Sequence, residues 1–287
     1  MYPFIHLGPV TLGTYGLMVA TGLICAFFVM RADIRRRGLD VDAESIIGIT
    51  GLAGLAGARL YHLLESPAEF FANPLPLLFS TTGFAWFGAL IGGFTALVLL
   101  ARSYRMKILL MLDVASPAAA VGYGIGRIGC LISGDGDYGT PTSLPWGMSF
   151  PNGLVPTTDR VHPTPIYEFL VALAIAYFLW RIGSRAIQDA HGSDPASQEA
   201  SHPAGEVFAW YLIATGIARF LVEFIRINPR SFFGLTNAQT ASVASVLSGA
   251  LLLLVLKSGS HDPRKLPPAD PRRKISRKAS RKASAAT

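Results

Sequence analysis

Seven long apolar stretches constrain the fold of this sequence more than any other feature. A helix needs about 20 mostly apolar residues to cross a bilayer. The stretches that approach this length lie at about 12–30, 44–64, 84–101, 110–132, 166–182, 205–226 and 237–256. Only 15% of the residues are charged, whereas soluble domains contain about 25%. We therefore predict an all-α membrane protein, a bundle of about seven transmembrane helices.

The distribution of lysine and arginine predicts the orientation of these helices. Cytoplasmic loops of membrane proteins are enriched in Lys and Arg. The basic segments are 31–43, 102–109 and 181–204, and the segments that alternate with them, with at most one Lys or Arg each, are 1–11, 65–83, 133–165 and 227–236. We therefore expect an N-terminus outside, a C-terminus in the cytoplasm, and a long outer-face loop at 133–165.

The domain organisation follows from a change in composition near residue 256. Ten of the 25 Lys and Arg residues lie after Leu256, in a segment rich in Pro, Ser and Ala that has no apolar periodicity. Such a segment buries too little apolar surface to fold. We predict a transmembrane domain over 1–256 and a basic, disordered cytoplasmic tail over 257–287. Because so many basic residues lie in this tail, the net charge of +7 does not indicate a nucleic-acid-binding protein.

Small residues and cysteines add two further expectations. The stretches 44–64 and 110–132 are rich in Gly and Ala. Small residues let helix backbones approach closely in a bilayer, so we expect both helices inside the bundle. The two cysteines, Cys25 and Cys130, form no pattern typical of a disulfide framework or a metal site, and we predict neither.

Several ionisable residues lie near the outer ends of the predicted helices. They are Arg59, Arg127, Glu168, Arg219, Glu223 and Arg226. A charge at that depth is costly unless it is paired. Arg219 and Glu223 are four residues apart, so they share a helix face and can pair. The set carries two more positive than negative charges, which Asp135 and Asp137 can partly offset.

An excess of guanidinium in a low-dielectric region favours an anion, because a guanidinium matches a phosphate with two parallel hydrogen bonds. We therefore predict that these residues bind the head group of a phospholipid. The alternative is a set of ion pairs that only holds the helices together.

The glycine-rich segment 122–139 also has two open interpretations, close helix packing or a loop whose backbone N–H groups bind phosphate. Its candidate substrate-binding residues are Gly126, Gly129 and Gly139.

Short motifs in the same order and spacing give a more specific indication. They are LGPVTLGTYGLM with Tyr15, GARLYHLLE with Arg59, FAWFGALIGG, GRIGCLISGDGDYG with Arg127, VHPTPIYEFL with His162 and Glu168, and ARFLVEFIR with Arg219. Over residues 5–256 the chain resembles the bacterial prolipoprotein diacylglyceryl transferases. The resemblance implies seven spans with the N-terminus outside, in the bacterial cytoplasmic (inner) membrane.

The resemblance also implies an activity. The family transfers the diacylglyceryl group of phosphatidylglycerol to the thiol of a lipobox cysteine in the signal peptide of a secreted prolipoprotein. The expected partners are therefore phosphatidylglycerol, the prolipoprotein and membrane lipids, and no metal or redox cofactor is implied. Such a reaction needs a deprotonated thiol and groups that stabilise the charge on the leaving phosphate. Arg127 and Arg219 suit the second task, with Arg219 matching the arginine regarded as essential.

This sequence departs from the family pattern at several polar positions. Phe87 stands where the third-helix motif usually has histidine, Cys130 replaces the signature asparagine, and Asp135 replaces the signature glutamate. The loop to Gly139 is also one residue longer, Thr215 replaces a tyrosine, and Gly13 stands where histidine is often found.

These departures leave the general base and the activity open. The candidates for the base are His162, because histidine is the residue type suited to proton transfer near neutral pH, then Asp135, Tyr15 and His62, or no protein base at all. His162 has an alternative role in holding the turn before Pro163. The second functional hypothesis is a divergent protein that binds or carries a phospholipid, or acts on another acceptor, without this transfer.

Overall fold

Helices and short hairpins make up the structure, a computed structural model that describes residues 2–65, 67, 70, 85–192, 203–232 and 234–260. In this part of the chain the helices are α1 (Thr14–Arg36), α2 (Ala43–Glu65), α5 (Trp86–Ser103), α6 (Ile108–Ser133), α7 (Thr164–Gly192), α9 (Glu206–Val222) and α10 (Asn237–Ser260). Three antiparallel hairpins join β1 (Phe4–Leu7) to β2 (Val10–Gly13), β3 (Met148–Phe150) to β4 (Thr157–Val161), and β5 (Arg230–Phe232) to β6 (Leu235–Thr236).

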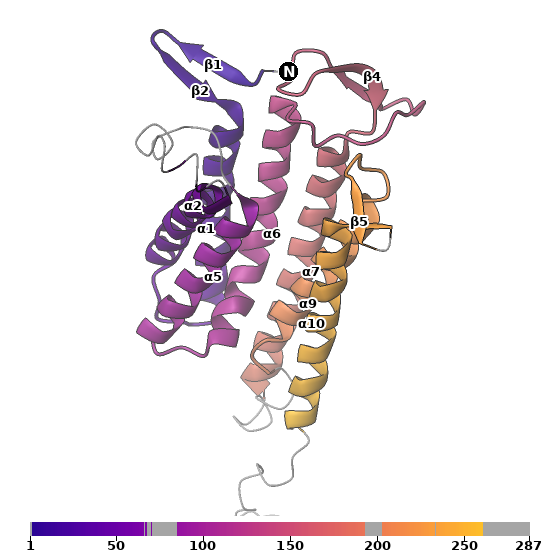
Figure 1. Cartoon of the computed structure of the whole chain (residues 1–287). Helices are drawn as coiled ribbons and strands as arrows, with labels where there is room; N and C mark the ends of the chain where they lie inside the picture. Colours follow the sequence, from indigo (N-terminus) through magenta and orange to yellow (C-terminus); the bar gives the residue numbers. More distant parts are fainter. Residues whose placement is uncertain are drawn as a thin grey trace, which may run out of the picture.

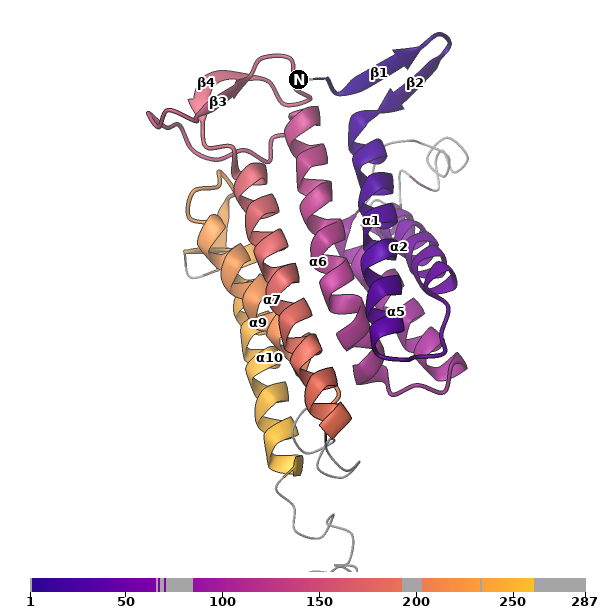
Figure 2. The same ribbon diagram turned by 180° about the vertical axis from the view of Figure 1, so that it is seen from behind.

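The helices stand side by side, and the hairpins β1–β2 and β3–β4 lie together at one end of them (Figures 1 and 2). We call this the hairpin end, formed by residues 2–13 and 134–163. Helix α6 is central, since it contacts α1, α5, α7 and α9. In its apolar stretch 56% of the residues are buried, more than in any other candidate span of the described residues.

Six helices of the described ranges are long and apolar enough to cross a membrane, judged by length and composition. They are α1, α2, α5, α6, residues Thr164–Arg185 of α7 and residues Asn237–Ser258 of α10. The chain is therefore a multi-pass membrane protein of the all-α class. Helix α9 has 17 residues and is shorter than the predicted stretch 205–226, so the seventh span stays a prediction.

Close approaches at glycine explain the tightest helix pairs. A Cβ atom on Gly22 of α1 would lie 2.9 Å from the Gly122 carbonyl oxygen of α6, and one on Gly57 of α2 would lie 2.3 Å from that of Gly88 on α5. The prediction that 110–132 lies inside the bundle is confirmed. The same prediction for 44–64 is wrong, because only 22% of the apolar stretch of α2 is buried. Its small residues bring it against α5 at the edge of the bundle.

A buried carboxylate fixes the position of α9 relative to α6. Asp113, which is 3% exposed, accepts hydrogen bonds from the backbone N–H groups of Gly205 and Phe208, both at 2.7 Å. Asp113 therefore binds the free amide groups at the N-terminus of α9, whose N-cap residue, Gly205, makes no capping hydrogen bond through a side chain. This contact lies at the end of α6 opposite to the hairpin end.

The predicted loop at 133–165 corresponds closely to the segment between α6 and α7. Helix α6 ends where Gly134 adopts a left-handed conformation with φ of 59°, which glycine tolerates best. The loop then forms β3 and β4, whose core is Tyr138, Phe150 and Val161. Helix α10 continues to Ser260, and the rest of the predicted tail, residues 261–287, lies outside the described residues.

Candidate functional site

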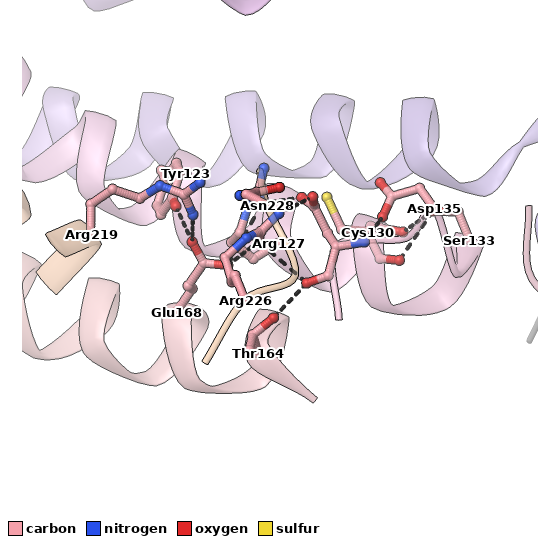
Figure 3. A network of polar contacts seen from close by, with 12 residues as sticks. Tyr123, Arg127, Cys130, Ser133, Asp135, Thr164, Glu168, Arg219, Arg226 and Asn228 are labelled. Carbon is pink, nitrogen blue, oxygen red and sulfur yellow. Dashed lines mark hydrogen bonds and ion pairs between the residues drawn. The ribbon is translucent and has the colours of Figure 1, made fainter. Parts of the chain in front are cut away.

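Six charged side chains form one ion-pair network near the hairpin end. Its members are Arg127 of α6, Asp137 of the following loop, Glu168 of α7, Arg219 of α9, and Glu223 and Arg226 just after α9. Figure 3 shows the three arginines directed toward Glu168 from different elements. We call this set the ion-pair network.

Glu168 is the central carboxylate of the network. Its Oε1 atom lies 3.0 Å from Arg219 Nη1, and its Oε2 atom lies 3.3 Å from Arg226 Nη1 and 3.7 Å from Arg127 Nη1. The hydroxyl of Tyr123 donates a hydrogen bond of 2.7 Å to Oε1. Because Tyr123 and Arg127 are four residues apart on α6, they share a helix face. Glu168 therefore joins α6, α7 and α9.

Two further carboxylates complete the charge balance. Glu223 Oε2 lies 3.0 Å from Arg219 Nη2, which confirms the predicted pairing of these two residues. Asp137 accepts from Arg127 Nη1 through one oxygen and from Arg226 Nη2 through the other. The network thus contains three guanidinium groups and three carboxylates.

The predicted excess of two positive charges is not found within the network, because Asp137 adds a third carboxylate to it. The prediction also counted Arg59, which lies on α2, and treated Asp137 as a partial offset. Asp137 instead bridges two arginines. An anion that binds here must replace a carboxylate rather than fill an uncompensated positive site.

The members of the network differ in exposure, and the Arg127 side chain lies between the extremes at 16%. The side chains of Glu168 and Arg226 are 5% exposed and that of Glu223 is fully buried, whereas those of Arg219 and Asp137 are each 28% exposed. Breaking a buried charge pair is strongly destabilising, because one charge is left without compensation. A ligand therefore reaches this network most directly through Arg219 and Asp137.

The charge states of the loop carboxylates differ. Burial alone would raise the pKa of Asp137, but the guanidinium groups of Arg127 and Arg226 outweigh it and lower this pKa below its ordinary value. Burial and the charge of Asp137 raise the pKa of Asp135 above its ordinary value. Two aspartates separated by one residue thus have opposite shifts, as expected where only one of them contacts arginine.

A second polar cluster, Tyr15, Cys130 and Asp135, borders the network. The thiol of Cys130 donates a hydrogen bond to the Asp135 carboxylate, and the two side chains lie close together in Figure 3. Asp135 also accepts the backbone N–H of Asp137 at 3.2 Å. Tyr15 lies against Gly129, where an added Cβ would be 3.3 Å from its ring. Three of the four predicted catalytic residues, Tyr15, Asp135 and Arg219, are therefore in or beside the network.

One group of side chains has the composition of a metal site. Ligand atoms of Cys130, Asp135 and Asp137 all lie within 4.8 Å of one another. A divalent cation at this position would compete with Arg127 and Arg226 for the Asp137 carboxylate. We therefore assign these residues to the polar clusters and not to a metal centre.

His162, the fourth predicted catalytic residue, has different partners. Its ring Nδ1 lies 3.3 Å from the Tyr167 hydroxyl, which also accepts a 2.7 Å hydrogen bond from Trp146 Nε1. Its backbone N–H donates to the Thr140 carbonyl, and its carbonyl accepts from the Gly139 N–H at 2.8 Å. These contacts match the alternative in which His162 holds the loop before α7. His62, a weaker candidate, lies on α2 with Nδ1 3.9 Å from Glu65.

The candidate glycines differ in the space around them. A Cβ on Gly126 would meet no atom within 4 Å, whereas one on Gly139 would lie 2.5 Å from the Ile225 carbonyl oxygen. Gly139 also forms a β-bridge with Arg226, so its lack of a side chain lets the loop reach the network. Gly129 allows the close approach of α1 to α6. Close packing explains Gly129 and Gly139, and Gly126 borders open space.

Sequence reasoning missed three residues that support the network. Tyr123 donates to Glu168, Asn228 donates to Glu223 at 2.6 Å, and Thr164 donates to the Asp137 carbonyl. Only Tyr123 had a detectable signal, its spacing of one helical turn from Arg127. The Thr164 contact joins residues that are 27 apart in sequence, and Asn228 and Glu223 are five apart but lie beyond the end of α9, where helix spacing does not apply.

Comparisons with known proteins identify the family of this chain. A family model described as prolipoprotein diacylglyceryl transferase matches residues 3–255. A phosphatidylglycerol–prolipoprotein diacylglyceryl transferase of Clostridium tetani is 32% identical over 240 residues, covering 82% of this chain and 89% of that protein. One of Geobacter sulfurreducens is 34% identical over 260 residues, covering 88% and 92%. This chain therefore belongs to the prolipoprotein diacylglyceryl transferase family.

Proposed function

We propose that this chain transfers the diacylglyceryl group of phosphatidylglycerol to the lipobox cysteine thiol of a prolipoprotein. The names of the relatives state both substrates and the group transferred. The observation that carries the proposal is the ion-pair network itself, in which three arginines from separate elements converge. Arginine suits the binding of phosphate because its planar donors form two parallel hydrogen bonds with phosphate oxygens.

In the proposed reaction the cysteine thiolate attacks the glyceryl carbon that bears the phosphate ester. A carbon–sulfur bond forms and the carbon–oxygen bond breaks, so glycerol phosphate leaves with the bonding electrons and an additional negative charge. Arg127 and Arg219 hold the phosphate and stabilise this charge. Arg219 suits this role because it is exposed enough to contact the lipid while Glu168 and Glu223 orient its guanidinium.

We propose Asp135 as the acceptor of the thiol proton. Its raised pKa brings it closer to neutral pH, where a general base is most effective. It lies beside Cys130 and close to Tyr15, whereas the His162 ring contacts Tyr167. We therefore propose Asp135 in preference to His162, the first choice from sequence.

We also propose the membrane orientation that the loop charges predict. The hairpin end faces outside, seven helices span the bacterial inner membrane, and the C-terminus is cytoplasmic. Support comes from the position of the network, since Arg127, Glu168 and Arg219 all lie near the hairpin ends of their helices. Reporter fusions at residues 40, 105 and 192 should report the cytoplasm and fusions at 75, 150 and 232 the outside. A cytoplasmic signal at 150 would contradict this orientation.

The function is tested with purified protein, labelled phosphatidylglycerol and a lipobox peptide. The wild-type chain should form the thioether product, and Arg127→Ala and Arg219→Ala should abolish it. Arg127→Lys should remain impaired, because lysine keeps the charge but not the planar donors. The control is Arg230→Ala, which removes an exposed arginine near the hairpin end that is outside the network.

Full activity of both arginine-to-alanine variants would contradict the proposed site. Lipid binding without any transfer by the wild-type chain would contradict the transferase and favour a phospholipid carrier. Rescue of a bacterium that lacks its own transferase gives an independent readout.

A further inference from the structure

Asp137 occupies the position in the network where a phosphate would make its contacts. One carboxylate oxygen accepts from Arg127 Nη1 and the other from Arg226 Nη2. Two oxygens that bridge two guanidinium groups have the arrangement that two oxygens of a phosphodiester would adopt. The donors that a bound head group requires are therefore already used by a side chain of the protein.

Asp137 is also the carboxylate of the network that can leave at least cost. Its side chain is 28% exposed, whereas Glu168 is 5% exposed and Glu223 is fully buried. Removing Glu168 or Glu223 from its partners would leave a buried charge without compensation, but the Asp137 carboxylate can turn toward water.

The backbone of Asp137 is held independently of its side chain. Its carbonyl oxygen accepts hydrogen bonds from Thr164 Oγ1 and from Arg226 Nη1, the latter at 3.3 Å. Two residues further along the chain, Gly139 lies close to the Ile225 carbonyl oxygen and donates a backbone hydrogen bond to the His162 carbonyl. Rotation about the Cα–Cβ bond of Asp137 can therefore release the carboxylate while the loop stays in place.

Release of this carboxylate changes the charge of the site by one unit. With Asp137 in place, Arg127, Arg219 and Arg226 balance Asp137, Glu168 and Glu223. With Asp137 turned away, three positive charges of the network face two negative ones, and the network itself keeps one positive charge. A phosphodiester carries one negative charge, so the opened site matches a phosphatidylglycerol head group, which has no compensating cation. An amine-bearing head group would bring its own positive charge into this site.

We propose that Asp137 is a specificity-determining residue that acts as a tethered substitute for the substrate phosphate. It leaves the two arginines when the lipid binds and returns when glycerol phosphate must depart. This inference rests on the proposed function. The leaving group is a phosphate monoester with up to two negative charges at neutral pH, which an uncontested arginine pair would retain. Return of the carboxylate to Arg127 and Arg226 makes the product easier to release.

The test compares Asp137→Asn with wild type in the transfer assay, together with inhibition by glycerol phosphate. Asparagine keeps the size of the side chain but removes the competing charge. We expect the KM for phosphatidylglycerol and the inhibition constant of glycerol phosphate both to fall roughly tenfold, the effect of one charge-assisted hydrogen bond. Asp137→Glu, which keeps the competing charge, should not show this fall in either constant. Asp159→Asn, at an exposed aspartate of the same loop, is the control.

A purely structural role for Asp137 would lower kcat or protein yield without tightening either constant. Unchanged KM and inhibition constants in active Asp137→Asn protein would overturn the inference and leave the transferase function intact. If wild type shows no transfer, the proposed function fails, and stabilisation against thermal unfolding by glycerol phosphate still tests Asp137. The same increase in Tm should need about tenfold less glycerol phosphate in Asp137→Asn than in wild type. An equal requirement for glycerol phosphate in the two proteins would overturn the inference.

Should Asp137→Asn fail to fold, Thr164→Val provides the second variant. It removes the hydroxyl that holds the Asp137 carbonyl while keeping the shape of the side chain. A less firmly held Asp137 competes less well, so glycerol phosphate should again bind more tightly than in wild type. Weaker or unchanged binding in this variant would count against the inference.

Discussion

Substitution of Glu168 by glutamine gives the sharpest measure of what the ion-pair network contributes to stability. Glu168 is 5% exposed and accepts from Tyr123, Arg219 and Arg226. Glutamine keeps the shape but removes the charge, so three guanidinium groups would face two carboxylates. Breaking a buried charge pair costs about 3–5 kcal/mol. At about 2–4 °C per kcal/mol, even the lower limit predicts that Tm falls by roughly 6–12 °C.

The assay is thermal unfolding of the purified protein in one detergent, with Glu65→Gln as the matched control. Glu65 is also a helical glutamate, but its side chain is 55% exposed and its contact with His62 is 3.9 Å. Surface substitutions of this kind usually change the free energy of unfolding by less than about 0.5 kcal/mol. A Tm for Glu168→Gln within 1 °C (about 0.5 kcal/mol) of the control would refute the view that the network is a coupled, buried unit.

Three other predictions concern the loop after α6. Gly139→Ala should lower both Tm and transfer, because its Cβ would lie 2.5 Å from the Ile225 carbonyl oxygen, whereas Gly126→Ala, with no atom within 4 Å, should change neither the fold nor Tm. The lowered pKa of Asp137 means that its stabilisation is present above the ordinary aspartate pKa and lost as pH falls through the lowered value. The Tm of Asp137→Asn should therefore fall less than that of wild type on acidification in this range. An equal dependence of Tm on pH in the two proteins would contradict the lowered pKa of Asp137. The raised pKa of Asp135 means that its ionisation destabilises the fold as pH rises from the ordinary to the raised value. At pH 7 the Tm of Asp135→Asn should therefore match or exceed that of wild type, while transfer becomes slower. A lower Tm with normal transfer would show that Asp135 stabilises the fold and is not the base.

The elements that could be predicted from sequence are those set by local pattern. Apolar stretches located each of the described helices, because the requirement for about 20 apolar residues acts within one segment. The pairing of Arg219 with Glu223 followed from a spacing of four residues on one helix. Helix α9 ends at Val222, before the predicted boundary at 226, because the next residues turn so that Arg226 can meet Gly139. That contact joins two loops and has no local signature.

The charge balance of the site could not be predicted for the same reason. Whether Asp137 offsets an arginine depends on the loop folding back over the end of α6, which the Thr164 and Gly139 contacts bring about. The sequence places Arg59 as close to the hairpin end as Arg127, and the helix that carries Arg59, α2, packs mainly against α5. Small residues on α2 indicate close packing but do not identify its partner.

The contact between Asp113 and the start of α9 has a mechanical consequence. The N-terminal end of helix α9 is attached to α6 by the hydrogen bonds of Gly205 and Phe208 to Asp113. Arg219 is 13 residues beyond Glu206, a rise of about 20 Å along the axis. The Asp113 carboxylate, at the end of α6 opposite to the hairpin end, therefore contributes to the height of the Arg219 guanidinium relative to Arg127, together with the packing of α9 against α7 and α10. Loss of this contact would weaken the attachment of α9 to α6 without altering any residue that surrounds the two arginines.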